Sequence, residues 1–403
     1  MTDLISATLV YDGSGAPHLP TQLHPDLDSQ KELDTFATQL KGTDLEKLCE
    51  IAGRACYSSF GKGRGSDEYH KHILDVGHLS VLEHAPFTVD ISDRDREYVP
   101  YLALMFINRP NIWISQQSPY GIRVTVNLRH VLEWDTFSPQ MAMDQDVLRA
   151  TGAALQELAH TMAPQIVAAR GLSHDVRRSE WEGTKINIPG TDATIRVVEP
   201  NVEEQQWVSM FLTGSRGFSH EQCRHGDWTA ISQRSTRFVD ESTSPWVMHP
   251  LEAAYRAEKY APLREEVAQT MAMDSASGSV GLAKAKYKEL VAELEPWLIA
   301  RGVDKVSARK QARGAARGYL GNALYTELLF SASISQWKRQ LRQRASQFAD
   351  AEIRQVYASE ARCVLGALKS SRYASAFAGW DMAPAPDGIG QVLVIAEPAA
   401  AKG

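Results

Sequence analysis

Two short segments of the sequence carry polar residues at matching positions and could bind an anion. Residues 107–118 read INRPNIWISQQS and residues 224–235 read RHGDWTAISQRS, so they align without a gap and share Ile-Ser-Gln-x-Ser. Arg109 stands near the head of the first segment, and Arg224 and His225 open the second. Arginine offers a forked pair of donors and serine adds a hydroxyl, so the segments suit a phosphate or carboxylate ligand. The competing interpretation of each arginine is a surface residue in a turn.

The match is interpreted as an internal duplication, because each segment follows an apolar strand and precedes a helical region. The helix-rich pattern with few strands predicts an α+β fold, made of two tandem copies of one helix-rich unit with a small antiparallel sheet. We expect a first repeat, a strand-rich connector, a second repeat and a flexible tail, over residues 1–172, 173–204, 205–380 and 381–403.

The spacing of apolar residues predicts the elements that position these segments. Helices are expected over 45–56, 69–76, 98–108, 124–134, 147–170, 251–300, 305–320, 323–345 and 347–370. Strands are expected over 7–11, 85–91, 185–188, 193–198 and 207–212. Pro189-Gly190 stands between the third and fourth of these strands and indicates a hairpin there.

Composition restricts the class of protein. The chain has 403 residues, 43 Lys+Arg, 49 Asp+Glu and a net charge of -6 without a block of like charges, which gives no electrostatic reason to expect duplex nucleic acid as a partner. The first residues lack the regions of a signal peptide, and no run of about 18 apolar residues occurs, so we expect neither secretion nor a membrane span. The four cysteines lack CxxC spacing, which fits a reducing cytoplasm without disulfides or structural zinc.

The second segment also carries a family signature. Arg224-His225-Gly226 followed by Ser235-Thr236-Arg237-Phe238 resembles the Arg-His-Arg and Ser-x-Arg-Tyr motifs of the flavin-dependent thymidylate synthases. Four further segments resemble motifs of that family and occur in the family's order: residues 52–59 (AGRACYSS), 78–88 (HLSVLEHAPFT), 124–129 (VTVNLR) and 316–326 (ARGYLGNALYT).

The resemblance implies an enzyme that binds FAD and uses methylene-tetrahydrofolate and NADPH as co-substrates to methylate C5 of dUMP. The residues that it places at the flavin cofactor are His78, Ser80, Glu83, Arg109, Asn127, Arg129 and His225. The residues that it places at the nucleotide are Glu221, Arg224, Gln233, Ser235, Arg237, Arg317 and Arg344. Arg224, Ser235 and Arg344 are the expected catalytic residues, since arginines near the pyrimidine carbonyls would stabilise developing negative charge. The flavin would carry the redox step.

The two copies keep complementary parts of this site. The second copy has Ser333 and Ser335 where the first has Asn127 and Arg129, so the flavin side of the second copy has diverged while its nucleotide side survives. The family forms homotetramers with sites between subunits. One chain is therefore expected to be a pseudo-dimer, and two chains to form a homodimer that is a pseudo-tetramer with fewer working sites than four.

Three positions depart from the family pattern. Gly226 replaces the third arginine of Arg-His-Arg, and Arg109 of the other copy is a candidate to fill its place. Glu221 and Gln233 replace a family glutamine and a family glutamate where a pyrimidine or ribose would be read. These changes leave open a related activity, such as C5 hydroxymethylation or a UMP or dCMP substrate, and also a nucleotide- or flavin-binding scaffold whose sites have decayed.

Several residues have structural interpretations that compete with chemical ones. Cys223 beside Arg224 could act as a nucleophile, but a small packed hydrophobe is the favoured interpretation. His78 and His84 could be ordinary histidines at the ends of elements. His72, His78 and His84 are spaced by six residues and share no helix face, so we expect no metal site.

Overall fold

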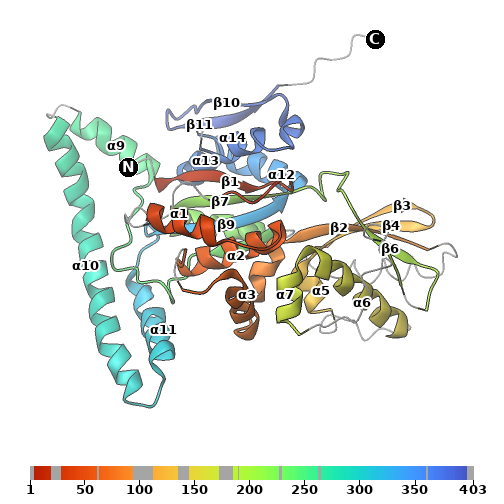
Figure 1. Ribbon diagram of the computed structural model, residues 1–403. Coiled ribbons are helices and arrows are strands. Elements are labelled where there is room, and N and C mark those ends of the chain that lie inside the picture. Colours follow the sequence, from red (N-terminus) through yellow and green to blue (C-terminus); the bar gives the residue numbers. More distant parts are fainter. Residues whose placement is uncertain are drawn as a thin grey trace, which may run out of the picture.

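The computed structural model describes residues 4–19, 29–60, 63–93, 112–134, 145–171, 185–188, 190–226, 229–261, 265–359 and 362–396 (Figure 1). The helices are α1 (Ser29–Gln39), α2 (Asp44–Tyr57), α3 (Ser66–Asp75), α5 (Leu128–Leu132), α6 (Gln145–Met162), α7 (Pro164–Ala169), α8 (Arg216–Gln222), α9 (Pro250–Tyr260), α10 (Glu265–Ile299), α11 (Lys305–Ala316), α12 (Ile334–Arg344), α13 (Ala351–Tyr357) and α14 (Val364–Lys369). A 3₁₀ helix, η2, spans Leu79–His84. The helices of this described part include none that is long and apolar enough to cross a bilayer.

The strands form two larger antiparallel sheets and a separate hairpin. Their bounds are β1 (Ser6–Tyr11), β2 (Pro86–Ser92), β3 (Trp113–Ser118), β4 (Gly121–Asn127), β5 (Lys185–Asn187), β6 (Thr194–Val198), β7 (Trp207–Ser215), β8 (Thr229–Gln233), β9 (Tyr325–Ser333), β10 (Trp380–Pro384) and β11 (Gln391–Ile395). One sheet has the order β3-β4-β2-β6-β5, and the other, read from its far edge, has the order β8-β9-β7-β1. The combination of antiparallel sheets with many helices is the mixed α+β class that the sequence predicts.

The two sheets agree in register as well as in order. In the first sheet Pro86 lies opposite Asn127, and in the second Trp207 lies opposite Ser333. Asn127 and Ser333 are also the N-cap residues of the next helix, where each side chain accepts a hydrogen bond from a backbone N–H of the first turn. Each central strand therefore ends at the same point relative to its neighbour and to the helix that follows.

A pair of buried hydroxyls repeats at the same register position. Two residues before each N-cap, Thr125 bonds to Thr88 across the first sheet (2.9 Å between the oxygens) and Ser331 bonds to Ser209 across the second (2.6 Å). All four residues are buried. Buried hydroxyls require partners, so the same solution at the same place is a specific similarity between the two sheets.

The pairing of β1 and β6 does not follow the expected division of the chain into a first repeat, a connector and a second repeat. β1 opens the chain but pairs with β7 in the second sheet, whereas β6, which comes shortly before β7, pairs with β2 in the first. The first expected repeat (1–172) thus includes a strand of the second sheet, and the expected connector (173–204) includes strands of the first.

The second sheet is covered on both faces (Figure 1). One face contacts α2 and η2 of the first half of the chain, and the other contacts α12, α13 and α14. His84, at the end of η2, joins the halves, because its Nδ1 lies 2.7 Å from the Ser331 hydroxyl and its Nε2 lies 3.0 Å from the Ser232 hydroxyl. This packing brings α2 and η2 beside the strand β8 that carries the second motif.

The buried His84 is expected to make stability depend on pH. Burial lowers the pKa of His84 from its ordinary value to about 3, so the folded chain keeps the ring neutral. Between pH 6.5 and pH 3 the unfolded chain binds a proton here that the folded chain does not bind, so the free energy of unfolding falls as the pH falls. From pH 7.5 to pH 5 this residue contributes a loss of about 2 kcal/mol, measurable by urea unfolding at both pH values.

Two glutamine variants, one a test and one a matched control, check this pH effect. His84→Gln is expected to reduce the pH dependence by that amount, whereas His220→Gln, at an exposed histidine, leaves it unchanged. An unaltered pH dependence in the His84 variant would show that the ring does not carry the effect.

Two apolar runs expected as helices contain strands. Residues 124–127 of the expected helix 124–134 belong to β4, and residues 325–333 of the expected helix 323–345 are β9; α5 and α12 begin only after them. Every residue of β9 is buried. A strand that is buried on both faces lacks the polar alternation that distinguishes it from a helix, which explains the error.

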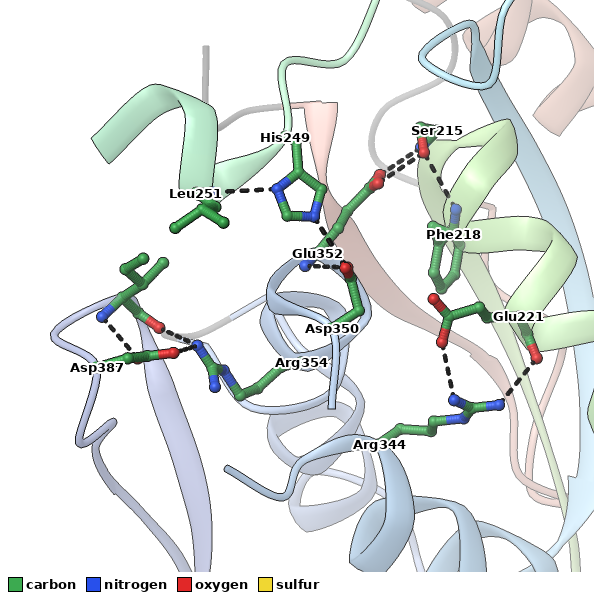
Figure 2. Close-up of polar contacts among 11 residues, drawn as sticks. Ser215, Phe218, Glu221, His249, Leu251, Arg344, Asp350, Glu352, Arg354 and Asp387 are labelled. Carbon is green, nitrogen blue, oxygen red and sulfur yellow. Dashed lines mark hydrogen bonds and ion pairs between the residues drawn. The ribbon is translucent and has the colours of Figure 1, made fainter. Parts of the chain in front are cut away.

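The segment expected as a flexible tail (381–403) contains most of a hairpin instead, formed by β10 and β11. Arg354 of α13 donates a hydrogen bond to Asp387 in the connection between these strands (2.6 Å; Figure 2). Arg354 is 33 residues away from Asp387 in the sequence, so the local composition of the segment 381–403 did not reveal this contact. Residues 397–403 lie outside the described part.

Most of the other expected elements are confirmed. They are the helices α2, α3 and α11, the strands β1, β2 and β7, and the hairpin β5–β6. The expected helix 251–300 is divided into α9 and α10, and the expected helix 347–370 into α13 and α14. The expected helix 147–170 is divided into α6 and α7, which has Pro164 in its first turn. The expected helix 98–108 lies outside the described residues.

Candidate functional site

A cleft of about 1030 Å³ lies where the two halves of the chain meet. The first half supplies α2, α3 and the start of η2, and the second supplies β8, the loop 234–238 and α11. Of the expected site residues, this cleft brings together His78, Ser80, Gln233, Ser235, Arg237 and Arg317.

The cleft is strongly cationic. Among the described residues that line it none is Asp or Glu, and its basic residues are Arg54, Arg64, Arg216, Arg234, Arg237, Lys310 and Arg317. Burial lowers the pKa of Arg216, which shows that this guanidinium has lost part of its hydration. Arg54 and Arg234 pair with the buried carboxylates of Glu50 and Glu241 behind this lining, so the charges that face an anionic ligand are those of Arg64, Arg216, Arg237, Lys310 and Arg317.

The loop that carries the second motif is fixed by buried polar contacts. Arg234 is buried and donates to Glu241 (3.3 Å), to Ser58 (2.8 Å) and to Ser244 (3.2 Å). The backbone N–H of Ser235 donates to the carbonyl of Cys56 in α2 (2.8 Å). Arg234 itself therefore faces the protein and holds the loop in place, so that residues 235–237 are presented to the cleft.

Three rings form an aromatic corner of the cleft. The Tyr57 ring lies edge to face with the rings of His78 (centroids 5.2 Å apart) and Phe238 (4.9 Å apart). The Tyr57 hydroxyl is 3.1 Å from His78 Nδ1, and burial lowers the pKa of His78, which keeps its ring neutral. The ammonium of Lys310 lies 4.8 Å from the centre of the Phe238 ring. Such a corner can pack against a flat heterocycle.

Arg344, Glu221 and His225 form a second cluster that does not line this cleft (Figure 2 shows the first two). Arg344 donates to the Glu221 carboxylate (2.8 Å) and to Nε2 of His225 (2.8 Å). Burial and the neighbouring Arg344 and Arg339 lower the pKa of His225 to about 4, so the neutral ring can accept this bond. Glu221 thus already neutralises the charge of Arg344.

The helix that carries Glu221 is anchored at its start by a buried carboxylate (Figure 2). Glu352 accepts bonds from the backbone N–H (2.7 Å) and hydroxyl (2.6 Å) of Ser215, and Ser215 caps α8 by accepting from the N–H of Phe218. Burial raises the pKa of Glu352. This contact sets the position of Arg216, the first residue of α8.

The remaining expected flavin residues lie elsewhere. Glu83 and Arg129 form an ion pair (2.5 Å), and Arg129 also pairs with Glu133 (2.8 Å). Asn127 is buried and caps α5. These residues do not line the cleft, and Arg109 lies outside the described residues.

Arg224 and Cys223 are both exposed on the 3₁₀ turn after α8, and neither lines the cleft. Partial desolvation raises the pKa of the Cys223 thiol even though Arg216 opposes the shift. A nucleophilic thiol requires the opposite shift, which supports the structural interpretation of Cys223. No group of three or more potential metal ligands occurs within the described part of the chain.

The residues that line the cleft and that the sequence pattern missed include Tyr57, Arg64, Arg216, Phe238 and Lys310. Tyr57, Arg216 and Phe238 lie inside or beside the recognised motifs, and that proximity is a signal that could have indicated them. Arg64 and Lys310 belong to no motif. Tertiary contacts bring them to the site: the Arg64 carbonyl accepts a hydrogen bond from Arg54 of α2 (2.7 Å), and Lys310 of α11 lies over the Phe238 ring.

The fold and the cleft agree with one family of proteins. Residues 39–102 and 196–366 match the family described as thymidylate synthase complementing protein, and the chain belongs to that family. The two matched segments supply the two walls of the cleft. Asn127 and Arg129 lie between these segments, outside the match.

The chain is also similar to individual members of the family, each named flavin-dependent thymidylate synthase. It is 38% identical over 160 residues to the protein from Mycobacterium tuberculosis (strain ATCC 25618 / H37Rv), which covers 39% of this chain and 56% of the relative. The protein from Mycobacterium sp. (strain JLS) is 36% identical over 166 residues, which covers 40% of this chain and 59% of the relative. The chain thus spans somewhat more than half the length of the relatives that it matches.

Proposed function

We propose that the protein methylates C5 of a pyrimidine nucleotide, converting dUMP to dTMP, with FAD as cofactor and methylene-tetrahydrofolate and NADPH as co-substrates. The observation that carries the proposal is the carboxylate-free cationic cleft, which both matched segments of the family build together. Its charge suits a nucleotide phosphate, and its aromatic corner suits a flat ring.

Ser235, Arg237 and Arg317 are the proposed phosphate-binding residues. All three line the cleft, and Arg317 approaches the loop through Thr236 (3.5 Å between Nη1 and Oγ1). Gln233 donates to Ser219 (2.7 Å) and to Thr326 (3.2 Å), so its amide is oriented before a ligand arrives. An amide held in this way can read the edge of a pyrimidine with little loss of side-chain entropy.

The cleft also fits a flavin nucleotide. His78 and Ser80 would contact it, Tyr57 and Phe238 offer ring faces and edges for its flat system, and the nearby cations suit its diphosphate. When bound, the flavin supplies the hydride that reduces the transferred one-carbon unit. The neutral state of His78 favours packing against an uncharged ring over pairing with an anion.

The experiment is to purify the protein, titrate it with FAD and analyse products by mass spectrometry. Incubation with dUMP, UMP and dCMP in turn, each with methylene-tetrahydrofolate and NADPH, is expected to give dTMP from dUMP alone. Absence of bound flavin together with absence of FAD binding on titration would overturn the proposal.

A second candidate is a related C5 modification of another pyrimidine nucleotide or with another product. The ion pair of Glu221 with Arg344 favours it, because this arginine is not free for a substrate anion unless Glu221 gives way. Product from UMP or dCMP, or a hydroxymethyl product, would establish this alternative. If none of the three nucleotides is converted although FAD and nucleotide bind, a decayed binding scaffold is the remaining explanation.

We also propose that the chain is a fused pair of family units. The common strand order, the common register, the repeated hydroxyl pairs and the equivalent places of β1 beside β7 and of β6 beside β2 support this interpretation. Two chains would then form a pseudo-tetramer with fewer than four working sites. Light scattering is expected to give twice the chain mass, and equilibrium dialysis fewer than two nucleotides per chain; a monomer would contradict the assembly.

A further inference from the structure

A second cavity, of about 220 Å³, lies at the junction of the two larger sheets and is separate from the cationic cleft. Equivalent positions of both sheets line it: Pro86 and Thr88 from β2, and Trp207 and Ser209 from β7. The equivalence follows from the shared register, since Pro86 and Trp207 each lie opposite a helix N-cap. The cavity therefore belongs to the contact between the two halves.

The segment between β6 and β7 closes one side of this cavity and brings a buried amide to it. Gln205 lines the cavity with only 2% of its surface exposed. Neither its amide oxygen nor its amide nitrogen has a hydrogen-bond partner among the described residues, and the indole N–H of Trp207, which also lines the cavity, has none either. Each such buried group costs about 1–3 kcal/mol if it stays unpaired, so three of them on two residues that line one cavity indicate a missing partner, which these side chains would reach by a small rotation toward the cavity.

The groups around the cavity are largely uncharged. Burial raises the pKa of Tyr11 and of Tyr373 to about 12, and burial lowers the pKa of His84 to about 3, so all three are neutral near pH 7. The charged lining residues Arg372 and Glu199 pair with each other (2.9 Å). An anionic or cationic ligand would find no uncompensated partner in this lining.

The size of the cavity limits the ligand. An apolar cavity of about 150 Å³ is enough to admit benzene, so 220 Å³ accommodates a six-membered ring with a few exocyclic atoms. A primary amide pairs best with a donor and an acceptor that stand side by side, as they do on the edge of a nucleobase. Phe87 and Tyr373 add aromatic surface to the lining.

We propose that this cavity binds an uncharged planar nitrogen heterocycle of pyrimidine size through the Gln205 amide and the Trp207 indole N–H. The site is distinct from the proposed nucleotide site, because its lining shares no residue with the cationic cleft. It does not depend on the proposed function.

The test uses uracil and cytosine as free bases on the full chain, with saturating dUMP present to occupy the other site, and follows binding by isothermal titration calorimetry. Saturable binding is expected for at least one of the two bases. Gln205→Leu is expected to weaken it at least about 10-fold, because the leucine keeps the bulk but removes both polar partners. Gln206→Leu changes the neighbouring residue, which does not line the cavity, and is expected to leave binding unchanged.

Two further measurements keep the result interpretable. Gln205→Leu is not expected to lower the free energy of unfolding of the free protein, since it removes an unpaired amide, so lost binding cannot be attributed to unfolding. Val198→Trp places a large side chain in the cavity lining and is expected to abolish binding of the base. Absence of binding of both bases, binding that survives both variants, or a crystal soak that shows ordered water only would overturn the proposal.

Discussion

Replacing Arg237 by alanine is expected to lower kcat/KM for the nucleotide substrate by about 10²- to 10³-fold. The side chain is exposed in a cleft whose described lining includes no carboxylate, so it is available to an anion. A charge-assisted, forked pair of hydrogen bonds to phosphate is lost in the variant, and the removal of one such donor from an active site has effects of this size. Steady-state kinetics with varied dUMP, followed as dTMP formation, measures the change.

The controls for this prediction separate binding from folding. Arg237→Lys keeps the charge but not the fork and is expected to give an intermediate loss. Arg149→Ala removes an exposed arginine of α6 that pairs with Asp146 at the surface, and is expected to leave kinetics and stability unchanged. Equal kcat/KM in the Arg237→Ala variant and the wild-type protein would exclude Arg237 from the nucleotide site.

Replacing Arg234 by methionine is expected to lower the free energy of unfolding by about 3–5 kcal/mol. Its side chain is only 5% exposed, and that of its partner Glu241 is 1% exposed, so the variant leaves a buried carboxylate without its cation. The hydrogen bonds to Ser58 and Ser244 are lost as well. Urea unfolding followed by circular dichroism measures the effect.

A double variant distinguishes the charge from the loss of packing. Arg234→Met combined with Glu241→Gln removes both charges and is expected to be less destabilised than the sum of the two single variants. Strictly additive effects would show that the two side chains do not stabilise each other. Because Arg234 holds the loop that presents Ser235 and Arg237, weaker nucleotide binding by the folded Arg234→Met protein is also expected.

Local sequence was sufficient for much of the site. The family-like segment around residues 224–238 predicted that Gln233, Ser235 and Arg237 act together, and the segment 78–88 predicted His78 and Ser80; the structure places all five in one cleft. These predictions rest on motifs whose residues are close in sequence and lie on one turn or loop. Whether the residues bind nucleotide and flavin stays a prediction until ligands are bound.

Other parts of the site could not be derived in this way. Arg344 pairs with Glu221, whose side chain lies on a helix more than a hundred residues earlier in the chain. Asn127 caps a helix and Arg129 joins two glutamates, so both have structural partners that a motif comparison does not reveal. Lys310 reaches the cleft only because α11 packs beside the second motif.

The sequence by itself determined the local elements and the family. The spacing of apolar residues in α2 and the glycine at the β5–β6 turn act within a few residues, so composition and spacing reveal them. The tertiary structure alone decided that residues 325–333 form a strand buried on both faces, and that β1 and β6 exchange sheets. Strand pairing and burial depend on partners that are distant in sequence, and the free energy of those contacts outweighs local preference.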